Sequence, residues 1–490
     1  MLVIISDLHF TDGSSGQTIG ASAFKIFKDR INEIAYRASK QKGNNYKPIE
    51  RIDILLLGDI LDLIRSDIWL KNPKGIRPWS DLQNDATIDV IEEITQKTLR
   101  YNKEALNVFK ALQEKESQVR ANVRTYQKKP SKIQLPIPVI NNRPAMRAAA
   151  SAMPANLQEA QQQHEHVDMY WQDVEVKIHY MVGNHDWFFH LKGEGYNKIR
   201  QSIIDAMGLS NKADEPFPHE PDESAELLKI LQEHKVLARH GDIYDNFNFE
   251  GDRDKASLGD AVVIELVNRF PDLVFRQYGD ELPSEFIEGL KELDNVRPIF
   301  HIPIWIAGLL ERTVKDKAVR KEVQKLWNAM VDDFMELDFI KSRDTWSPID
   351  RIDQLQIALK ISQLPFETLN NLVLKLQKLL PDDPSSASFS KYAAKEEELG
   401  CENSPYNYVV YGHTHHFEMT PLRVCDAANG DKINKLYLNS GTFRAVHDLV
   451  ALDERERQFF SHKVMTYLIF YKEDERKGRG FEVWNGALGM

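Results

Sequence analysis

The chain has 490 residues, a formal net charge of −11, and a composition of 42% hydrophobic and 28% charged residues. This balance is typical of a globular protein and excludes intrinsic disorder as the main state. The longest apolar run, residues 299–310, is shorter than the roughly 20 residues that span a bilayer, and it contains His301 and Pro303. We therefore expect no transmembrane segment.

The cysteines and the first residues bear on cellular location. Met1 is followed directly by the apolar residues 2–5, without the basic region and long apolar stretch of a secretory signal peptide, so we expect a cytoplasmic protein. Only Cys401 and Cys425 occur, which cannot make a disulfide framework for a chain of this size, and neither stands in a C-x-x-C pair. Any bound metal is therefore expected on His, Asp, Glu or Asn side chains.

Five short apolar runs rich in β-forming residues each end in Asp, His, Gly or Asn. They cover residues 2–6, 52–57, 176–182, 235–239 and 408–411. Each predicts a buried strand with polar side chains at its carboxyl end, and further strands are predicted at 435–438, 464–471 and 480–484. A helical pattern at 23–39 follows the first run. We therefore predict an α/β protein with a sheet covered on both faces.

Two intervals between these strands are too long to be simple connections. The first interval contains a predicted helix over about 85–127, then a segment with several prolines and an Ala/Gln-rich tract at 148–163. The second interval contains helical patterns at about 258–269, 313–341 and 354–379, followed by a polar stretch at 381–404. We interpret both as mostly helical insertions. The predicted organisation is a core at 1–70, 173–250 and 405–490, with insertions at 71–172 and 251–404.

The ends of the five predicted strands carry potential metal ligands. In chain order they are Asp7-Leu8-His9, Gly58-Asp59-Ile60-Leu61-Asp62, Gly183-Asn184-His185-Asp186, His240-Gly241-Asp242 and Gly412-His413-Thr414-His415. One such motif alone is typical of a turn or a helix cap. Five of them at successive strand ends bury polar groups at a cost that bound cations would offset. Two metal ions about 3.5–4 Å apart need a bridging carboxylate, for which Asp59 is the candidate.

This ordered set of motifs resembles the calcineurin-like metallophosphoesterase superfamily, over about 1–65, 175–245 and 405–450. The resemblance implies a four-layer αββα sandwich with a dinuclear metal centre at the sheet edge. It implies that one ion is held by Asp7, His9 and His415, and that the other is held by Asn184, His240 and His413, with Asp59 bridging both. The expected cofactors are two divalent ions, with Mn²⁺ first and Fe, Zn²⁺, Co²⁺ or Ni²⁺ as alternatives.

The resemblance also implies roles beside the metal ligands. His185 would stabilise developing charge or protonate the leaving oxygen, and Asp186 would orient it. Asp62 and Asp242 are expected to fix the orientation of the ligands, with helix capping as the alternative. The segment 439–442, Asn-Ser-Gly-Thr, is similar to the closing loop of the family and would bring its own backbone NH groups or Arg444 close to the phosphate.

The predicted reaction is metal-dependent hydrolysis of a phosphate ester or anhydride by a metal-bridging hydroxide, on a small-molecule or lipid-linked substrate. The pattern His240-Gly-Asp-x-x-Asp245 is similar to bacterial UDP-diacylglucosamine pyrophosphohydrolases, but that branch has Arg where this chain has His185, and its insertions are shorter. Ser/Thr protein phosphatases carry Arg-Gly where this chain has Leu63-Ile64. Neither substrate class is therefore favoured.

Three further interpretations stay open. Between Lys110 and Arg147 nine basic residues stand against two acidic ones, a patch that would bind nucleic-acid phosphates or form a solvated helix face. Because Gly-Asn-His-Asp also occurs in SbcD-type DNA nucleases, a nuclease is the alternative function. A non-catalytic scaffold, like the retromer subunit of similar fold, predicts degraded ligands, whereas here all are present. The run 299–310, with Trp305, either lines an acyl groove or packs inside its insertion.

Overall fold

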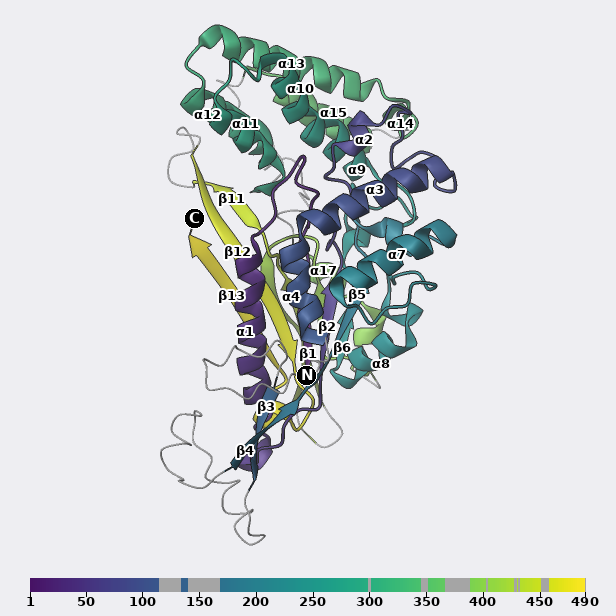
Figure 1. Cartoon of the computed structure of the whole chain (residues 1–490), viewed down its shortest axis with the longest axis vertical. Helices are drawn as coiled ribbons and strands as arrows, with labels where there is room; N and C mark the ends of the chain where they lie inside the picture. Colours follow the sequence, from purple (N-terminus) through teal and green to yellow (C-terminus); the bar gives the residue numbers. More distant parts are fainter. Residues whose placement is uncertain are drawn as a thin grey trace, which may run out of the picture.

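The computed structural model describes residues 1–113, 134–139, 168–297, 301–344, 351–365, 388–401, 404–426, 430, 432–450 and 458–489. Over these residues the chain is an α/β protein with two mixed sheets and a separate strand pair (Figure 1). The predicted fold class is confirmed at this level. No described helix is both long enough and apolar enough to cross a membrane.

The larger sheet is built on three parallel strands in the order β5-β2-β1. These are β1 (Leu2–Ile5), β2 (Arg51–Leu57) and β5 (Glu175–Met181). Beyond β1 the sheet continues through antiparallel β12 (Phe459–Phe470), which also pairs with β13 (Phe481–Gly489), to β11 (Ala445–Leu449) and β7 (Val296–Arg297). Because β1, β2 and β5 are parallel, their carboxyl ends meet at one edge.

The smaller sheet has the order β6-β8-β10-β9. Its strands are β6 (Val236–Ala238), β8 (Tyr408–Tyr411), β10 (Lys432–Ser440) and β9 (Phe417–Asp426). The first three are parallel to one another and β9 is antiparallel to β10. The remaining pair, β3 (Gln134–Val139) and β4 (Asp168–Asp173), is antiparallel. Each strand predicted from the sequence is present, and β3, β4, β7, β9 and β11 were not predicted.

Alternate residues of β1 point into two different apolar clusters, as the period of two in a strand requires. Val3 and Ile5 join the cluster that contains buried residues of the helices, whereas Leu2 and Ile4 join a cluster with Val410 of β8 and other residues of the smaller sheet. The helices of the first cluster are α1 (Ala21–Ala38), α3 (Asp85–Tyr101), α4 (Lys103–Gln113) and α7 (Glu194–Met207). β1 and β2 are therefore covered on both faces.

A separate apolar cluster lies within residues 258–359 (Figure 1, top). Its elements are α9 (Leu258–Val262), a π-helical turn (Val263–Asn268), α10 (Arg269–Tyr278), α11 (Ser284–Lys291), α12 (Ile302–Thr313), α13 (Lys317–Met335), α14 (Asp338–Lys341) and α15 (Arg351–Ser362). In α12 all residues from Ile302 to Leu310 are buried, and Trp305 stacks on His447 with ring centroids 4.5 Å apart. The described part of the apolar run, Ile302–Leu310, therefore packs in this cluster and, through Trp305, against β11.

The remaining α-helices are α2 (Ile68–Lys71), α8 (Ala225–Glu233) and α17 (Ser390–Ala393). The long helix predicted over 85–127 is two helices, α3 and α4, within the described part, and both pack in the same cluster as β1. The Ala/Gln-rich tract, most of the segment between Lys110 and Arg147, and residues 366–379 of the last predicted helix lie outside the described residues.

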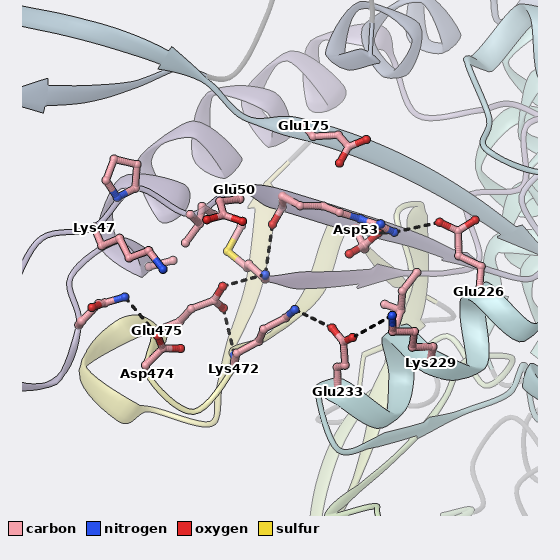
Figure 2. Close-up of a pocket in the computed structure, with 17 residues that line it drawn as sticks. Lys47, Glu50, Asp53, Glu175, Glu226, Lys229, Glu233, Lys472, Asp474 and Glu475 are labelled. Carbon is pink, nitrogen blue, oxygen red and sulfur yellow. Dashed lines mark hydrogen bonds and ion pairs between the residues drawn. The ribbon is translucent and has the colours of Figure 1, made fainter.

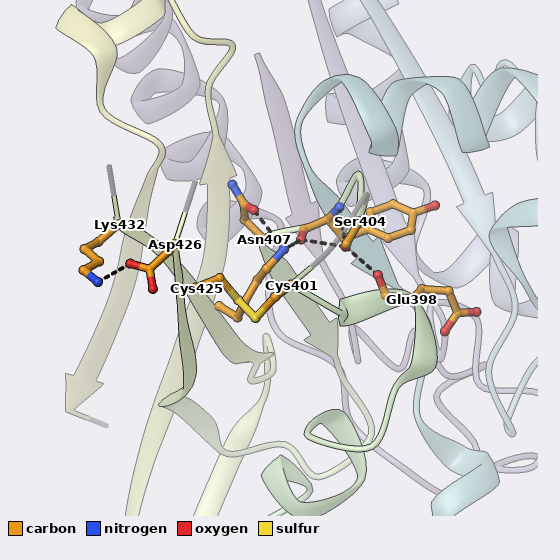
Figure 3. The surroundings of a disulfide bond; sticks show 9 residues. Glu398, Cys401, Ser404, Asn407, Cys425, Asp426 and Lys432 are labelled. Atoms are coloured by element: carbon orange, nitrogen blue, oxygen red, sulfur yellow. Dashed lines mark hydrogen bonds and ion pairs between the residues drawn. A yellow bond between two sulfur atoms is a disulfide. The ribbon is translucent and has the colours of Figure 1, made fainter. Parts of the chain in front are cut away.

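The two cysteines form one disulfide, Cys401–Cys425, which joins the segment after the 3-10 turn Glu397–Leu399 to strand β9 (Figure 3). The sequence analysis excluded a disulfide framework and did not predict this single bond. Disulfides persist mainly in oxidising compartments. The bond therefore gives no support to the expected cytoplasmic location, which stays a prediction.

Candidate metal centre

Five of the seven predicted ligand residues have backbone conformations that side-chain-bearing residues seldom adopt. Their φ angles are 53° at Asp7, 44° at His9, 54° at Asp59, 67° at His413 and 62° at His415. Among the other described non-glycine residues, only three have positive φ. Left-handed conformations cost free energy and collect at functional sites. The backbone of the turns after β1, β2 and β8 is therefore held in unfavourable conformations by the surrounding structure.

Asp7, His9 and His415 bring three potential ligand atoms together after β1 and β8. His9 Nε2 lies 3.0 Å from His415 Nε2, and His415 Nε2 lies 3.4 Å from Asp7 Oδ1. The other nitrogen of His9, Nδ1, lies 2.8 Å from Asp62 Oδ2. A carboxylate accepts, so Nδ1 carries the proton and the lone pair of Nε2 faces this group.

The second group consists of His240, His413 and Asn184. His240 Nδ1 donates to the Leu57 carbonyl at 3.0 Å, and His413 Nε2 donates to Asp245 Oδ2 at 2.9 Å. In the neutral imidazoles the opposite nitrogens carry lone pairs, and these lie 3.2 Å and 2.9 Å from Asn184 Oδ1. Acceptor atoms thus face one another, and a bound cation would satisfy all of them.

The orientation of the Asn184 amide is itself fixed by a chain of hydrogen bonds. Asp245 Oδ2 accepts from Asn248 Nδ2 at 2.7 Å, so Asn248 Oδ1 is free to accept from Asn184 Nδ2 at 3.3 Å. This direction of donation leaves Asn184 Oδ1 pointing at the two imidazoles. Its oxygen, not its nitrogen, therefore belongs to the group.

Asp59 lies between the two groups. Its Oδ2 is 3.6 Å from His9 Nε2 and 3.2 Å from His240 Nε2, while Oδ1 accepts from the His185 backbone N–H at 2.8 Å. The same carboxylate is thus within reach of a ligand from each group. This is the position that a bridging carboxylate of a two-metal site requires.

The glycines beside the proposed ligands lie so close to the ligand side chains that a Cβ atom at these positions would clash with them. A Cβ atom on Gly183 would lie 2.4 Å from Asp59 Oδ1, and one on Gly412 would lie 2.6 Å from Asp7 Oδ2. Gly58 combines a φ of 79° with a Cβ position 2.5 Å from His240 Nδ1. These contacts are far below van der Waals distance, so the motif glycines are needed for the ligands to approach one another.

Burial and charge act against each other in this site. Burial raises the pKa of Asp7. Burial also opposes ionisation of Asp59, but the charges of His240 and His185 hold its pKa well below the usual range. Despite its burial, the charge of Asp59 raises the pKa of His240 to about 10. Without metal the protein therefore binds a proton at His240, which a metal ion would have to displace.

His185 is oriented by Asp62 rather than by Asp186. Its Nδ1 lies 2.8 Å from Asp62 Oδ1, and the other oxygen of the same carboxylate accepts from His9. Asp186 instead accepts hydrogen bonds from Tyr180 Oη at 2.6 Å and from the backbone N–H groups of residues 183 and 60 at 2.6 and 2.8 Å. Asp186 therefore fixes the loop, and its expected role in orienting His185 is corrected.

Asp242 also differs from the expectation. Its carboxylate accepts two hydrogen bonds from Arg253, at 2.7 and 3.1 Å, and so turns toward Arg253 rather than toward a proposed ligand. The carboxylate that orients a ligand here is Asp245, through His413. The spacing His240-Gly-Asp-x-x-Asp245 contained this residue, but nothing in the sequence indicated which of its two carboxylates turns toward the site.

Arg444 is buried beside the site with 4% of its surface exposed. Its Nη2 donates to Asp294 Oδ2 at 2.8 Å, and no described residue accepts from its Nη1. Burial, followed by the charge of Arg444, lowers the pKa of His9, so the guanidinium is within electrostatic reach of the first group. The neighbouring Thr442 hydroxyl donates to the Asp7 carbonyl at 2.7 Å and braces that turn.

A pocket lies at the opposite, amino ends of β1, β2 and β5 (Figure 2). Residues of both charge signs line it, and within it the Met1 ammonium lies 3.2 Å from Glu475 Oε1. None of the predicted ligands lines this pocket. It is therefore separate from the candidate metal centre.

Searches against protein-family models and against curated proteins found no match. The buried His/Asp groups on an α/β fold support a metal site on geometric grounds. Of the nine basic residues of the predicted patch, only Lys110 lies in the described part of the chain, so the interpretation of the patch remains a prediction.

Proposed function

We propose that the chain is a dinuclear metallophosphoesterase of the calcineurin-like kind, which hydrolyses a phosphate ester or anhydride. One observation carries the proposal: Asp59 Oδ2 lies within 3.6 Å of a ligand nitrogen from each of two groups of converging acceptors. In this assignment Asp7, His9 and His415 hold one ion, and Asn184, His240 and His413 hold the other. The donor set of imidazole, carboxylate and amide oxygen suits Mn²⁺ first, and also Fe, Zn²⁺, Co²⁺ or Ni²⁺.

The proposed architecture is the four-layer αββα sandwich. It is supported by the apolar cluster that β1 and β2 share with β8 and β10, and by further apolar clusters on the outer faces of the two sheets. The proposed core covers 1–70, 173–250 and 405–490. The insertion 251–404 would be a cap, since its helices from α9 to α15 form their own apolar cluster.

Two bound divalent ions supply Lewis acidity, which activates water for attack on phosphorus and neutralises phosphate charge. The side chains of the protein then have three tasks. Asp62 holds both His9 and His185 through its two oxygens, so a ligand and the proposed proton donor share one anchor. His185 would donate a proton to the leaving oxygen from its Nε2, because its Nδ1 is engaged with Asp62. Arg444 would bind a phosphate oxygen through Nη1.

The cap limits which substrates reach the site. Asp294, in the short 3-10 turn Leu293–Asn295, holds Arg444, and Asn268 donates to the Ile64 carbonyl at 2.8 Å, so the cap contacts the segments beside the metal centre. Large substrates would have to displace these contacts. We therefore expect small-molecule or lipid-linked phosphodiesters or pyrophosphates to be better substrates than a protein.

The test is hydrolysis by metal-free protein reconstituted with Mn²⁺, with bis-p-nitrophenyl phosphate, p-nitrophenyl phosphate and labelled single-stranded DNA as substrates. Asp59→Ala is the blank, and Asp222→Asn, a change at an exposed residue, is the matched control. We expect Mn²⁺-dependent cleavage of the synthetic diester that Asp59→Ala abolishes and Asp222→Asn retains. Cleavage of DNA instead would favour the nuclease, and equal activity in Asp59→Ala would refute the metal assignment.

A further inference from the structure

A second cluster of metal-binding side chains lies outside the proposed dinuclear centre. His190, His219 and Asp254 each offer one ligand atom, and these atoms lie within 4.8 Å of one another. His219 Nε2 is 3.1 Å from Asp254 Oδ1, and His190 Nε2 is 3.9 Å from Asp254 Oδ2. The two imidazole rings lie 4.3 Å apart. None of the three residues belongs to the five motifs at the strand ends.

The hydrogen bonds of the cluster present His190 as a ligand. Its Nδ1 lies 3.0 Å from the Phe217 carbonyl, which only accepts, so Nδ1 carries the proton and the Nε2 lone pair faces Asp254. A carbonyl that fixes the tautomer in this way is the usual second partner of a metal-bound imidazole.

His219 is the second imidazole of the cluster. It is buried with 5% of its surface exposed, and no described residue hydrogen-bonds its Nδ1. Its other nitrogen, Nε2, faces Asp254 and is therefore the atom through which His219 would bind a metal ion.

We propose that His190, His219 and Asp254 form a mononuclear Zn²⁺ site, with solvent completing the coordination. Ligand atoms of a tetrahedral zinc ion with bonds of about 2.0–2.1 Å are about 3.3 Å apart. His219 Nε2 lies 3.1 Å from Asp254 Oδ1, near this value, whereas His190 Nε2 lies 3.9 Å from Oδ2 and would move closer when an ion binds. Solvent can reach the site because 41% of the Asp254 side chain is exposed. Two further charged groups face it: Glu223, 3.8 Å from His190 Nδ1, and Arg253, which donates to the His219 carbonyl.

The proposed zinc site lies beside two segments that carry or position residues of the proposed dinuclear centre. His190 ends the 3-10 turn Trp187–His190, which directly follows the loop that carries Asn184 and His185. Asp254 follows Arg253, whose guanidinium holds Asp242 two residues after His240. An ion here would tie together two segments that position residues of the dinuclear centre, so we assign it a positioning role rather than a catalytic one.

The experiment counts zinc ions bound to the full-length chain after metal removal and equilibrium dialysis against Zn²⁺, in wild type, Asp254→Asn, Asp59→Ala and the double variant. We expect Asp254→Asn to bind one ion fewer than wild type, and Asp59→Ala to retain one ion that the double variant loses. Asp222→Asn, which changes an exposed carboxylate in a neighbouring turn, should bind as wild type.

The proposal does not depend on the proposed function, and the variants separate the two. Unchanged zinc content in Asp254→Asn and in His190→Gln would overturn the third site, whatever Asp59→Ala does. If Asp59→Ala is the only variant that binds less zinc than wild type, the dinuclear centre is the protein's only zinc site. Thermal unfolding in the presence of a chelator shows whether Asp254→Asn is folded, because the folded variant should then have the same Tm as metal-free wild type. Addition of Zn²⁺ should raise the Tm of the variant less than that of wild type.

Discussion

The His185 imidazole and the Asp62 carboxylate are joined by a 2.8 Å hydrogen bond, through the oxygen that also accepts from the Arg65 backbone N–H at 3.0 Å. The second oxygen of Asp62 accepts from His9. One fully buried carboxylate thus sets the orientation of a proposed metal ligand and of the proposed proton donor. Coupling of this kind makes Asp62 as sensitive to substitution as a ligand.

Asp62→Asn should lower kcat about 10–100-fold, the usual effect of losing a partner of a metal-bound imidazole. An amide has one oxygen for two N–H donors, so either His9 or His185 must lose its partner. Mn²⁺-dependent hydrolysis of bis-p-nitrophenyl phosphate measures the effect, with Asp222→Asn as the control. Unchanged kcat would show that neither imidazole depends on Asp62.

His185→Ala should leave the metal content intact and reduce kcat by about 10²–10⁴-fold, the range of general acid–base catalysis. The side chain of His185 lies outside the two proposed ligand groups, although its backbone N–H contacts Asp59. The deficit should be smaller with p-nitrophenyl leaving groups than with alkyl leaving groups, which need protonation more. Full turnover on both would remove His185 from the mechanism.

Gly183→Ala should weaken metal binding at least tenfold, because the new methyl group would meet Asp59 Oδ1 at 2.4 Å and His240 Nε2 at 2.7 Å. Gly20→Ala is the matched control, since its Cβ would have only the Ser22 hydroxyl nearby, at 3.8 Å. Titration of both metal-free variants with Mn²⁺ measures the difference. Equal affinities would mean that the ligands do not need the close approach seen here.

The strand ends and their ligands could be predicted because both depend on local sequence. A buried β-run such as 52–57 followed by Gly58 and Asp59 predicts a strand and a tight turn whatever the rest of the chain does. Parallel pairing of β1, β2 and β5, and of β6, β8 and β10, then brings the motifs together, and the structure agrees with that expectation.

The partners of the ligands could not be predicted in the same way. The pairing of Arg444 with Asp294 spans 150 residues and depends on how the segment that carries Asp294 packs beside β11. The choice between Asp62 and Asp186 as the partner of His185 depends on side-chain directions in the two loops that follow β2 and β5, which no spacing encodes. The same is true of Asp242 and Asp245. Sequence patterns thus predicted which residues converge on the candidate site, whereas the hydrogen bonds that orient them depend on packing.

The metal-free protein should lose stability as the pH rises, and metal should reverse this trend. The charge of Asp59 raises the pKa of His240 from 6.5 to about 10 in the folded protein. A raised histidine pKa stabilises the fold fully below the unfolded value of 6.5, and this contribution disappears as the pH rises through about 10. Between these values the unfolding free energy of the metal-free protein therefore decreases with rising pH.

Thermal unfolding of chelator-treated and Mn²⁺-loaded protein across this pH range provides the measurement. We expect the Tm of the metal-free protein to fall with pH, and the Tm increase caused by Mn²⁺ to grow, because neutral His240 binds metal without first losing a proton. His240→Gln should flatten both trends. The opposite result would be a Tm increase on Mn²⁺ binding that becomes smaller from neutral to alkaline pH. It would contradict the assignment of His240 as a ligand that loses its proton when the metal binds.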